Sequence, residues 1–310
     1  MYHRFGDGRF PSTNITLEQF DAHISEIQSG GYNVRPLPEI IAAFRKREPL
    51  PDRTIAITID DAYSSVYEEA WPRLRQAGLP FTLFVATDAV DRRLADIMSW
   101  DQIRELATAG VTIGSQTASH PHMPALSQAQ NQAEIDRSSQ RFREELGFTP
   151  TLFAYPYGES GLEQQQLIRS AGFVAAFGQH SGVQHADTDL YNLPRFALNE
   201  RFGSLDRFRL AANALPLPVS DVTPADTVLR EQNPPAFGFT VDQRIKRLDR
   251  LNCYASNQSG AARLERLGPN RIEVRIDEAF DPGRGRINCT LPAGDGRWRW
   301  FGVQFYIPKA

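Results

Sequence analysis

The segment Thr54-Ile55-Ala56-Ile57-Thr58-Ile59-Asp60-Asp61 decides the fold, because an apolar, strand-forming run ends in two adjacent carboxylates. This run reads as a β-strand, and the later run Phe81–Val85 is the kind expected of a parallel strand covered on both faces. Two neighbouring carboxylates raise each other's pKa, so such a pair occurs at a turn, beside a cation, or where one of them acts as a base. The pair alone favours a plain turn. The motifs that follow later in the chain are needed to choose between a turn, a cation site and a catalytic base.

Up to about residue 212, strand-like runs alternate with amphipathic helical segments. We expect helices at 17–28, 37–46, 64–76, 100–109, 128–146 and 162–171, and strands at 32–34, 54–59, 81–85, 111–113, 152–154 and 173–177. Repeated βα units predict a parallel sheet or barrel. The candidate site residues follow the carboxyl ends of strands, which form the functional face of such barrels.

Beyond residue 212 the helical periodicity disappears. Several prolines form a linker, and strand-like segments separated by turns follow at 236–241, 247–255, 262–267, 271–276, 284–291 and 298–307. We therefore predict an α/β fold, with a (β/α) barrel at 1–212 and an all-β sandwich at 213–310. Alternation along the last segment places Trp298 and Trp300 on one face, where we expect them to be buried rather than exposed as a sugar-stacking platform.

Composition excludes some partners. The net charge of -3 provides no basic field for nucleic acid or anionic lipid, and no apolar stretch approaches the roughly 20 residues that span a bilayer. The chain opens as Met1-Tyr2-His3, which reads as the middle of a strand, so we expect residues upstream, including a signal peptide.

Cys253 and Cys289 are the two cysteines of the chain, and they form either a disulfide or two buried thiols. A bridge would favour the periplasm or the exterior. We predict a periplasmic or secreted protein, and a cytoplasmic location stays open.

Three motifs carry a family resemblance. Thr58-Ile59-Asp60-Asp61, the run Gln116-Thr117-Ala118-Ser119-His120-Pro121, and Phe153-Ala154-Tyr155-Pro156-Tyr157-Gly158 follow successive strands. In order and spacing they resemble the signatures of the polysaccharide deacetylases, carbohydrate esterase family 4 with its NodB-homology domain. The resemblance covers roughly residues 1 to 200 and implies a distorted (β/α) barrel of about seven strands.

The resemblance also implies roles. Asp61 and His120 would ligate a divalent metal, commonly zinc, and Asp60 would be the base for a metal-activated water. The backbone N–H of Tyr157 would help to hold the tetrahedral oxyanion.

The second signature departs from the family at its first histidine, which is Gln116 here. An amide oxygen is a weaker zinc ligand than an imidazole. Gln116 ligates through its oxygen, a water fills the place, His122 substitutes, or the site binds metal poorly; the sequence leaves these alternatives open.

The third signature lacks its arginine, because Ala154 stands there. In the family this arginine orients the base, and Arg195 follows another strand-like segment from which it could supply the cation; a surface arginine is the alternative. No copy of the family's acid histidine is visible, so we assign His180 to that role, with His185 second. We place His3, Trp100, Tyr155 and Pro156 at the substrate-binding surface.

Taken together, the residues and the resemblance predict a metal-dependent hydrolase that removes acetyl groups from a glycan, by the resemblance one that carries N-acetylhexosamine. Two alternatives remain. One is a catalytically silent glycan-binding or assembly protein on the same fold, and the other is an esterase that acts on O-acetyl groups.

Overall fold

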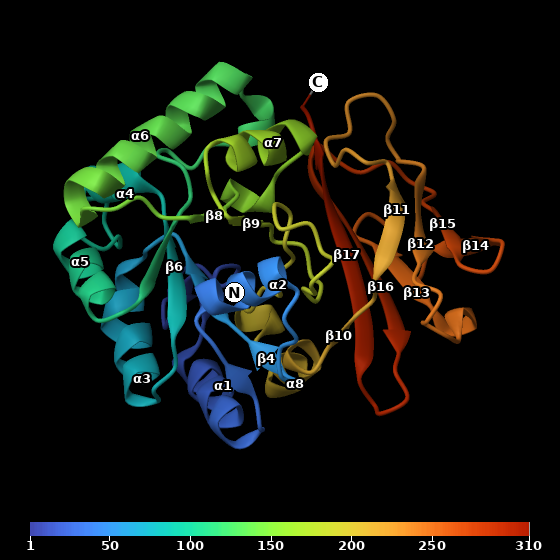
Figure 1. Cartoon of the computed structure of the whole chain (residues 1–310), viewed down its shortest axis with the longest axis horizontal. Helices are drawn as coiled ribbons and strands as arrows, with labels where there is room; N and C mark the ends of the chain where they lie inside the picture. The colour runs from blue at the N-terminus through green and yellow to red at the C-terminus, as the bar shows by residue number, and fades with distance from the viewer. Residues whose placement is uncertain (310) are drawn as a thin grey trace.

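A computed structural model describes residues 1–309, in which an α/β unit is followed by an all-β unit (Figure 1). This agrees with the predicted fold class. The centre of the first unit is a five-stranded parallel sheet in the order β5-β6-β7-β8-β9. Its strands are β5 (Ile57–Asp60), β6 (Phe81–Val85), β7 (Thr112–Ser115), β8 (Leu152–Ala154) and β9 (Ala175–Phe177).

Short segments extend this sheet at both edges. Tyr2 forms a parallel bridge to Ile59 of β5, and Leu193 forms one to Phe177 of β9. The Leu198 N–H donates to the Met1 carbonyl oxygen at 3.0 Å, which joins the two added segments to each other. The sheet therefore curls toward a closed barrel, and this closure brings the chain around residue 195 next to the start of the chain.

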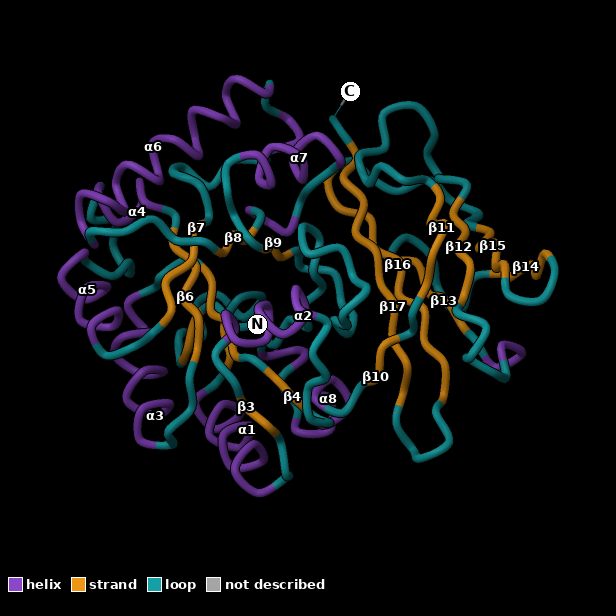
Figure 2. Tube along the Cα trace, viewed as in Figure 1, coloured by secondary structure: helices purple, strands orange, loops and turns teal. Residues whose placement is uncertain are grey.

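Helices surround the strands on the outside (Figure 2). They are α1 (Leu17–Ser29), α2 (Leu37–Lys46), the π-helix η1 (Val66–Ala70), α3 (Trp71–Gln76), α4 (Thr87–Asp91), α5 (Trp100–Thr108), α6 (Gln128–Leu146), α7 (Leu162–Ser170) and α8 (Leu205–Ala212). Capping boxes fix the starts of three of them, at Thr16, Ser99 and Ser127. Inside the sheet, Ile59, Leu83 and Val85 are fully buried, as the continuous apolar runs predict.

Three predicted elements differ in the structure, one of them the strand expected at 247–255, which begins as a 3₁₀ turn at 248–250. The strand expected at 54–59 is interrupted at Ala56, so that β4 (Thr54–Ile55) pairs with β3 (Asn33–Val34) and β5 joins the main sheet. The helix expected at 64–76 begins as the π-helix η1 before it continues as α3. Short pieces that the apolar pattern did not predict include β1 (Arg4–Phe5), β2 (Asn14–Ile15), η2 (Met123–Ala125), η3 (Pro156–Gly158), η4 (Glu200–Phe202) and η5 (Leu248–Arg250).

The all-β unit consists of two four-stranded sheets, in the orders β10-β17-β16-β13 and β11-β12-β15-β14. The strands are β10 (Leu215–Pro216), β11 (Val219–Thr223), β12 (Phe237–Val241), β13 (Asn252–Ala255), β14 (Arg263–Leu267), β15 (Arg271–Arg275), β16 (Gly283–Pro292) and β17 (Trp298–Ile307). Phe237, Phe239 and Phe305 are fully buried in the core of this unit. The domain boundary at 212/213 stays a prediction, and residue 310 lies outside the described residues.

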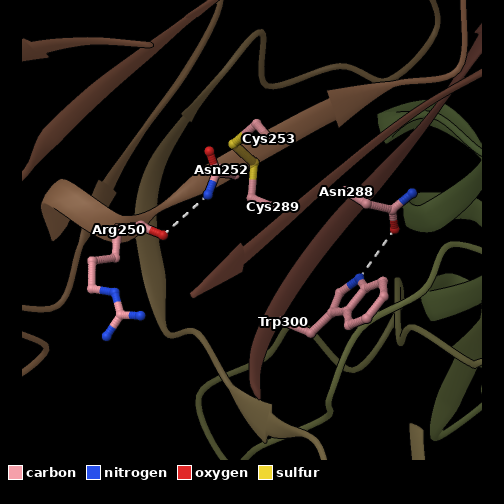
Figure 3. Close-up of a disulfide and its surroundings, with 6 residues drawn as sticks. All are labelled: Arg250, Asn252, Cys253, Asn288, Cys289 and Trp300. Carbon is pink, nitrogen blue, oxygen red and sulfur yellow. Dashed lines mark hydrogen bonds between the residues drawn. A yellow bond between two sulfur atoms is a disulfide. The ribbon is translucent and has the colours of Figure 1, made fainter. Parts of the chain in front are cut away.

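Cys253 of β13 and Cys289 of β16 are paired across the two strands and form a disulfide (Figure 3). The expected burial of both tryptophans in β17 is wrong for Trp298, which keeps 36% of its surface exposed because it lies where the β16–β17 hairpin extends beyond the core. Trp300 is half-buried, and its indole N–H donates to Asn288 at 3.1 Å (Figure 3). None of the helices in residues 1–309 has the length and apolar character needed to cross a bilayer.

Candidate active site

The loops that follow β5, β7 and β8 meet at the carboxyl edge of the central sheet. Left-handed backbone conformations gather in these loops, at Asp61 (φ 76°), Ala62 (φ 50°), Thr117 (φ 67°), His120 (φ 58°) and Tyr157 (φ 58°). Each costs a residue with a side chain of order 1–3 kcal/mol, and such residues cluster where function requires a particular backbone direction. The predicted site residues thus occupy the most strained part of the barrel.

Asp60 ends β5 and is fully buried. The guanidinium of Arg195 donates to both of its carboxylate oxygens, from Nη1 to Oδ1 at 2.7 Å and from Nη2 to Oδ2 at 2.9 Å. Arg195 is itself held by the carbonyl of Gly178, which accepts from Nε at 2.9 Å. The structure therefore brings Arg195 onto the carboxylate from a segment 135 residues away in sequence.

Burial alone would raise the pKa of Asp60, but the charges of Arg195 and His3 outweigh it and hold the pKa below its usual range. Asp60 is therefore a carboxylate at neutral pH, the form that accepts a proton. His3 lies on its other side, with Nε2 4.0 Å from Oδ2 of Asp60.

Asp61, His120 and Gln116 converge beside this pair. Nε2 of His120 lies 3.5 Å from Oδ1 of Asp61 and 3.1 Å from the side-chain amide nitrogen of Gln116. Oδ1 of Asp61 and Oε1 of Gln116 are both buried and have no hydrogen-bond partner among the described residues. Buried acceptors of this kind are costly unless something electropositive is bound to them.

This donor set fits a divalent cation. It offers a carboxylate oxygen, an imidazole nitrogen and an amide oxygen, and the oxygen and nitrogen of a glutamine amide are interchangeable by a flip. Burial lowers the pKa of His120 more than the nearby carboxylates of Asp61 and Asp60 raise it, so its imidazole is neutral and able to ligate. Within residues 1–309 no group of three or more His, Cys, Asp or Glu side chains is placed to hold a metal, because the third position here is a glutamine.

The third loop contributes a free backbone donor. Tyr157 lies in η3, and its N–H has no acceptor among residues 1–309, whereas the following Gly158 N–H donates to the Tyr155 carbonyl at 2.8 Å. Its ring is perpendicular to the ring of His120, with the centroids 4.5 Å apart. The residue predicted to supply the oxyanion donor thus contacts the candidate metal ligand through its ring.

His122, the alternative ligand, is engaged elsewhere. Its ring stacks on Tyr157 with the centroids 4.3 Å apart, and its Nδ1 lies 2.7 Å from Oε2 of Glu159. Burial raises the pKa of Glu159, and the hydrogen bond with His122 partly offsets this. The structure therefore gives His122 a carboxylate partner instead of a place beside Asp61.

The structure does not bring His180 to the rim. Its side chain is buried, and burial together with the charge of Arg195 lowers its pKa to about 4, so the ring is not the acidic imidazolium at neutral pH. It lines a cavity of about 320 Å³ between the barrel and the sandwich, together with Trp300 and Val303. The assignment of His180 as general acid has no support in this position. His185, the second choice, lines the same cavity.

Three residues predicted at the substrate surface are core residues instead. Trp100 is 9% exposed, packs edge-on against Phe142, and donates its indole N–H to Asp91 at 2.7 Å. Tyr155 is fully buried, and its hydroxyl donates to the Tyr191 carbonyl. Pro156 is buried beside it. Their apolar surface is buried in the core. A local sequence motif does not distinguish such packing from a role in binding.

Sequence reasoning missed Glu159 and Gln304. Glu159 directly follows the third motif, and its position next to Gly158 was the available signal. Gln304 of β17 donates its side-chain amide to the Tyr157 carbonyl at 3.0 Å, across 147 residues of sequence. Nothing local to β17 indicates that contact.

Comparisons with known proteins point to one enzyme family. The family model described as polysaccharide deacetylase matches residues 47–176, which include Asp60, Asp61, Gln116 and His120. The match covers less than half of the chain, and over that part the chain is similar to the polysaccharide deacetylase family. The predicted enzyme class, a hydrolase of that family, is thereby confirmed, whereas His3, Arg195 and the sandwich lie outside the matched range.

Individual relatives cover the same part. A putative polysaccharide deacetylase of Bacillus subtilis, YxkH, is 25% identical over 195 residues, which are 63% of this chain and 68% of the relative. The poly-beta-1,6-N-acetyl-D-glucosamine N-deacetylase of Staphylococcus aureus is 21% identical over 202 residues, which are 60% of this chain and 68% of the relative. The structure of IcaB from Ammonifex degensii superposes with a TM-score of 0.61 at 24% identity, covering 69% of this chain and 95% of IcaB, and supports the fold.

Proposed function

We propose that this chain is a metal-dependent hydrolase that removes acetyl groups from an N-acetylhexosamine-containing glycan. The observation that carries the proposal is the buried Asp60–Arg195 pair beside the unpartnered oxygens of Asp61 and Gln116. The named activity of the staphylococcal relative supports an amide-bonded acetyl group on a hexosamine.

Asp61, His120 and Gln116 would hold the cation, zinc being our first choice because a neutral imidazole is among the ligands. A bound divalent cation lowers the pKa of water and polarises a carbonyl oxygen. Protein groups accept the proton and bind the oxyanion. Asp60, kept ionised by Arg195, accepts a proton from the attacking water, and the free N–H of Tyr157 donates to the developing oxyanion.

The leaving amine needs a proton, and His3 is the candidate that the geometry favours. Its Nε2 lies 4.0 Å from Oδ2 of Asp60, and its side chain is 14% exposed. An imidazole at this place could pass a proton to a leaving nitrogen without moving. We propose His3 as general acid in place of His180.

The test combines metal content with product release. Purified protein is expected to bind about one equivalent of zinc per chain, and to release acetate from N-acetylglucosamine oligomers faster than from acetylated xylan. Retention of less than a tenth of an equivalent after zinc soaking would favour a silent glycan-binding protein. Gln116 is the reason to consider this alternative, because an amide is a weaker zinc ligand than an imidazole. Faster release from acetylated xylan would favour an O-acetyl esterase.

Two variants divide the proposed roles. Asp60→Asn should lower kcat by about 10³-fold or more while zinc stays bound, because it removes the base and keeps the ligands. Gln116→His should tighten zinc binding, because an imidazole replaces a weaker amide ligand. An unchanged zinc affinity in Gln116→His would place residue 116 away from the metal.

The Cys253–Cys289 disulfide supports a periplasmic or secreted location, since such bonds persist in oxidising compartments. Alkylation of thiols in acid-quenched cells is expected to leave both cysteines unlabelled. Full labelling of both would contradict this location.

A further inference from the structure

The loop that carries the candidate oxyanion donor is held from outside the barrel. Tyr157 has a left-handed backbone, and the following Gly158 does as well, with φ of 69°. A side chain at residue 158 would collide with the backbone nitrogen of Gln179, so only glycine fits where the loop packs against the segment after β9. Such a conformation persists only where the surroundings impose it.

The sandwich supplies those surroundings. In Figure 1, β17 is the strand of the sandwich that runs along the side facing the barrel, with its end beside α7. Gln304, in the middle of β17, is 6% exposed and donates its amide to the Tyr157 carbonyl at 3.0 Å. Its oxygen accepts from Nε of Arg286, on the neighbouring strand β16, at 2.9 Å. Both functions of the amide are used, which fixes its orientation.

Further contacts hold the residues that follow. The Thr227 hydroxyl donates to the Ser160 carbonyl at 2.6 Å, and Asp226 accepts from the Leu162 N–H at 3.2 Å. The guanidinium of Arg284, on β16, lies 3.8 Å from the buried Glu159 carboxylate. Residues of the second unit therefore contact the segment from Tyr157 to Leu162 at four positions, 157, 159, 160 and 162.

We propose that Gln304 is a positioning residue of the deacetylase site, through which the sandwich sets the direction of the Tyr157 N–H. The inference rests on the proposed function, because it gives that N–H its catalytic use. The Tyr157 carbonyl shares its peptide plane with the Gly158 N–H, and the Tyr157 N–H lies in the preceding plane, joined to it through the Tyr157 Cα. A donor on the carbonyl fixes the second plane and so restrains the left-handed turn at Tyr157, with φ of 58° and ψ of 7°, that sets where the Tyr157 N–H points. The sandwich is then part of the catalytic unit and not a separate glycan-binding module.

The test uses Gln304→Glu in the full chain. The substitution keeps the size of the side chain and its acceptor for Arg286, but it replaces the donor to Tyr157 with a second acceptor. The matched control is Asn288→Asp on β16, which makes the same amide-to-acid change and keeps the acceptor for the Trp300 N–H (Figure 3). Both variants are compared with the unmodified chain for kcat and KM on N-acetylglucosamine oligomers.

Gln304→Glu should lower kcat about tenfold with KM changed less than twofold, the size expected when one restraining hydrogen bond is lost at a reacting centre. Asn288→Asp should leave both constants within twofold. Equal effects of the two variants, or a kcat of Gln304→Glu within twofold of the unmodified chain, would overturn the inference. If Gln304→Glu does not fold, Gln304→Met, which also lacks the donor, is judged by the same criteria.

A second readout does not depend on turnover. Amide hydrogen exchange in the peptide 155–160 should be at least fivefold faster in Gln304→Glu and unchanged in Asn288→Asp, because the loop has lost its outer restraint. Unchanged exchange in that peptide would overturn the inference. If the unmodified chain releases no acetate from any acetylated glycan, the proposed function fails, and exchange still decides whether Gln304 positions the loop.

Discussion

The carboxyl rim of the barrel and the interior of the sandwich differ in backbone strain and in polarity. The rim concentrates left-handed residues such as Asp61, His120 and Tyr157, and it buries oxygen atoms of Asp61 and Gln116 that have no partner within residues 1–309. The sandwich core is aromatic and aliphatic, and a disulfide ties two of its paired strands. Strain and unpaired polar atoms cost stability, so a fold keeps them where function needs them and stabilises them from elsewhere. Each prediction below changes one side of this comparison.

The largest effect is expected at the rim, from Arg195→Met. This variant leaves the fully buried Asp60 carboxylate without its cation, and breaking a buried pair in this way costs about 3–5 kcal/mol of unfolding free energy. Urea unfolding at pH 7 measures the loss. The double variant Arg195→Met with Asp60→Asn should recover most of it without recovering activity, because the uncompensated charge is gone but so is the base. A single variant as stable as the unmodified chain would show that the pair is not buried as described.

The second effect should fall on the sandwich alone. Replacing Cys253 and Cys289 by alanine opens a crosslink with a sequence separation of 36, which should cost about 3–4 kcal/mol in the loop-closure estimate. Below its new unfolding midpoint, the variant should keep the kcat of the unmodified chain, since the disulfide lies in strands β13 and β16 away from the Tyr157 contact. Thermal unfolding and acetate release are the two measurements. A tenfold fall in kcat at full folding would couple the disulfide to the rim and weaken the comparison.

Features set by contacts between residues close in sequence could be predicted, whereas features set by distant contacts could not. Helices such as Gln128–Leu146 and strands such as Phe81–Val85 were predicted at their observed bounds, because periodicity and caps are local signals. The strand break at Ala56 and the π-helix η1 were missed, because tertiary packing sets them.

The candidate site divides in the same way. Asp60, Asp61, Gln116 and His120 were found because each ends a strand or follows one within a motif. Trp100, by contrast, fills the core between two helices, which its sequence neighbourhood does not reveal. Gln304 could not be found, since the contact that gives it a possible role spans 147 residues.

The smallest effect concerns His23 in the body of the barrel, a buried polar group whose two ring nitrogens are both paired and which should act on stability alone. His23 of α1 is fully buried, with Nδ1 3.0 Å from the Tyr2 hydroxyl and Nε2 2.9 Å from the Gly203 carbonyl. Burial lowers its pKa to about 4. The unfolded chain takes up a proton at this residue below its ordinary pKa of about 6.5, whereas the folded chain does so only near 4, so stability should fall as pH drops between these values.

Linkage gives about 2 kcal/mol of stability lost at His23 between pH 7 and pH 5. His23→Gln cannot take up this proton, so its unfolding free energy should change less over the same interval by about that amount, although the variant is less stable than the unmodified chain at pH 7. Urea unfolding at the two pH values measures the difference. His180, whose pKa is also lowered to about 4, remains in both chains and cancels in the comparison. Since both ring nitrogens of His23 are paired within the body of the barrel, its substitution should leave kcat at pH 7 within twofold. An identical pH dependence in the two chains, or a large loss of kcat, would contradict this prediction.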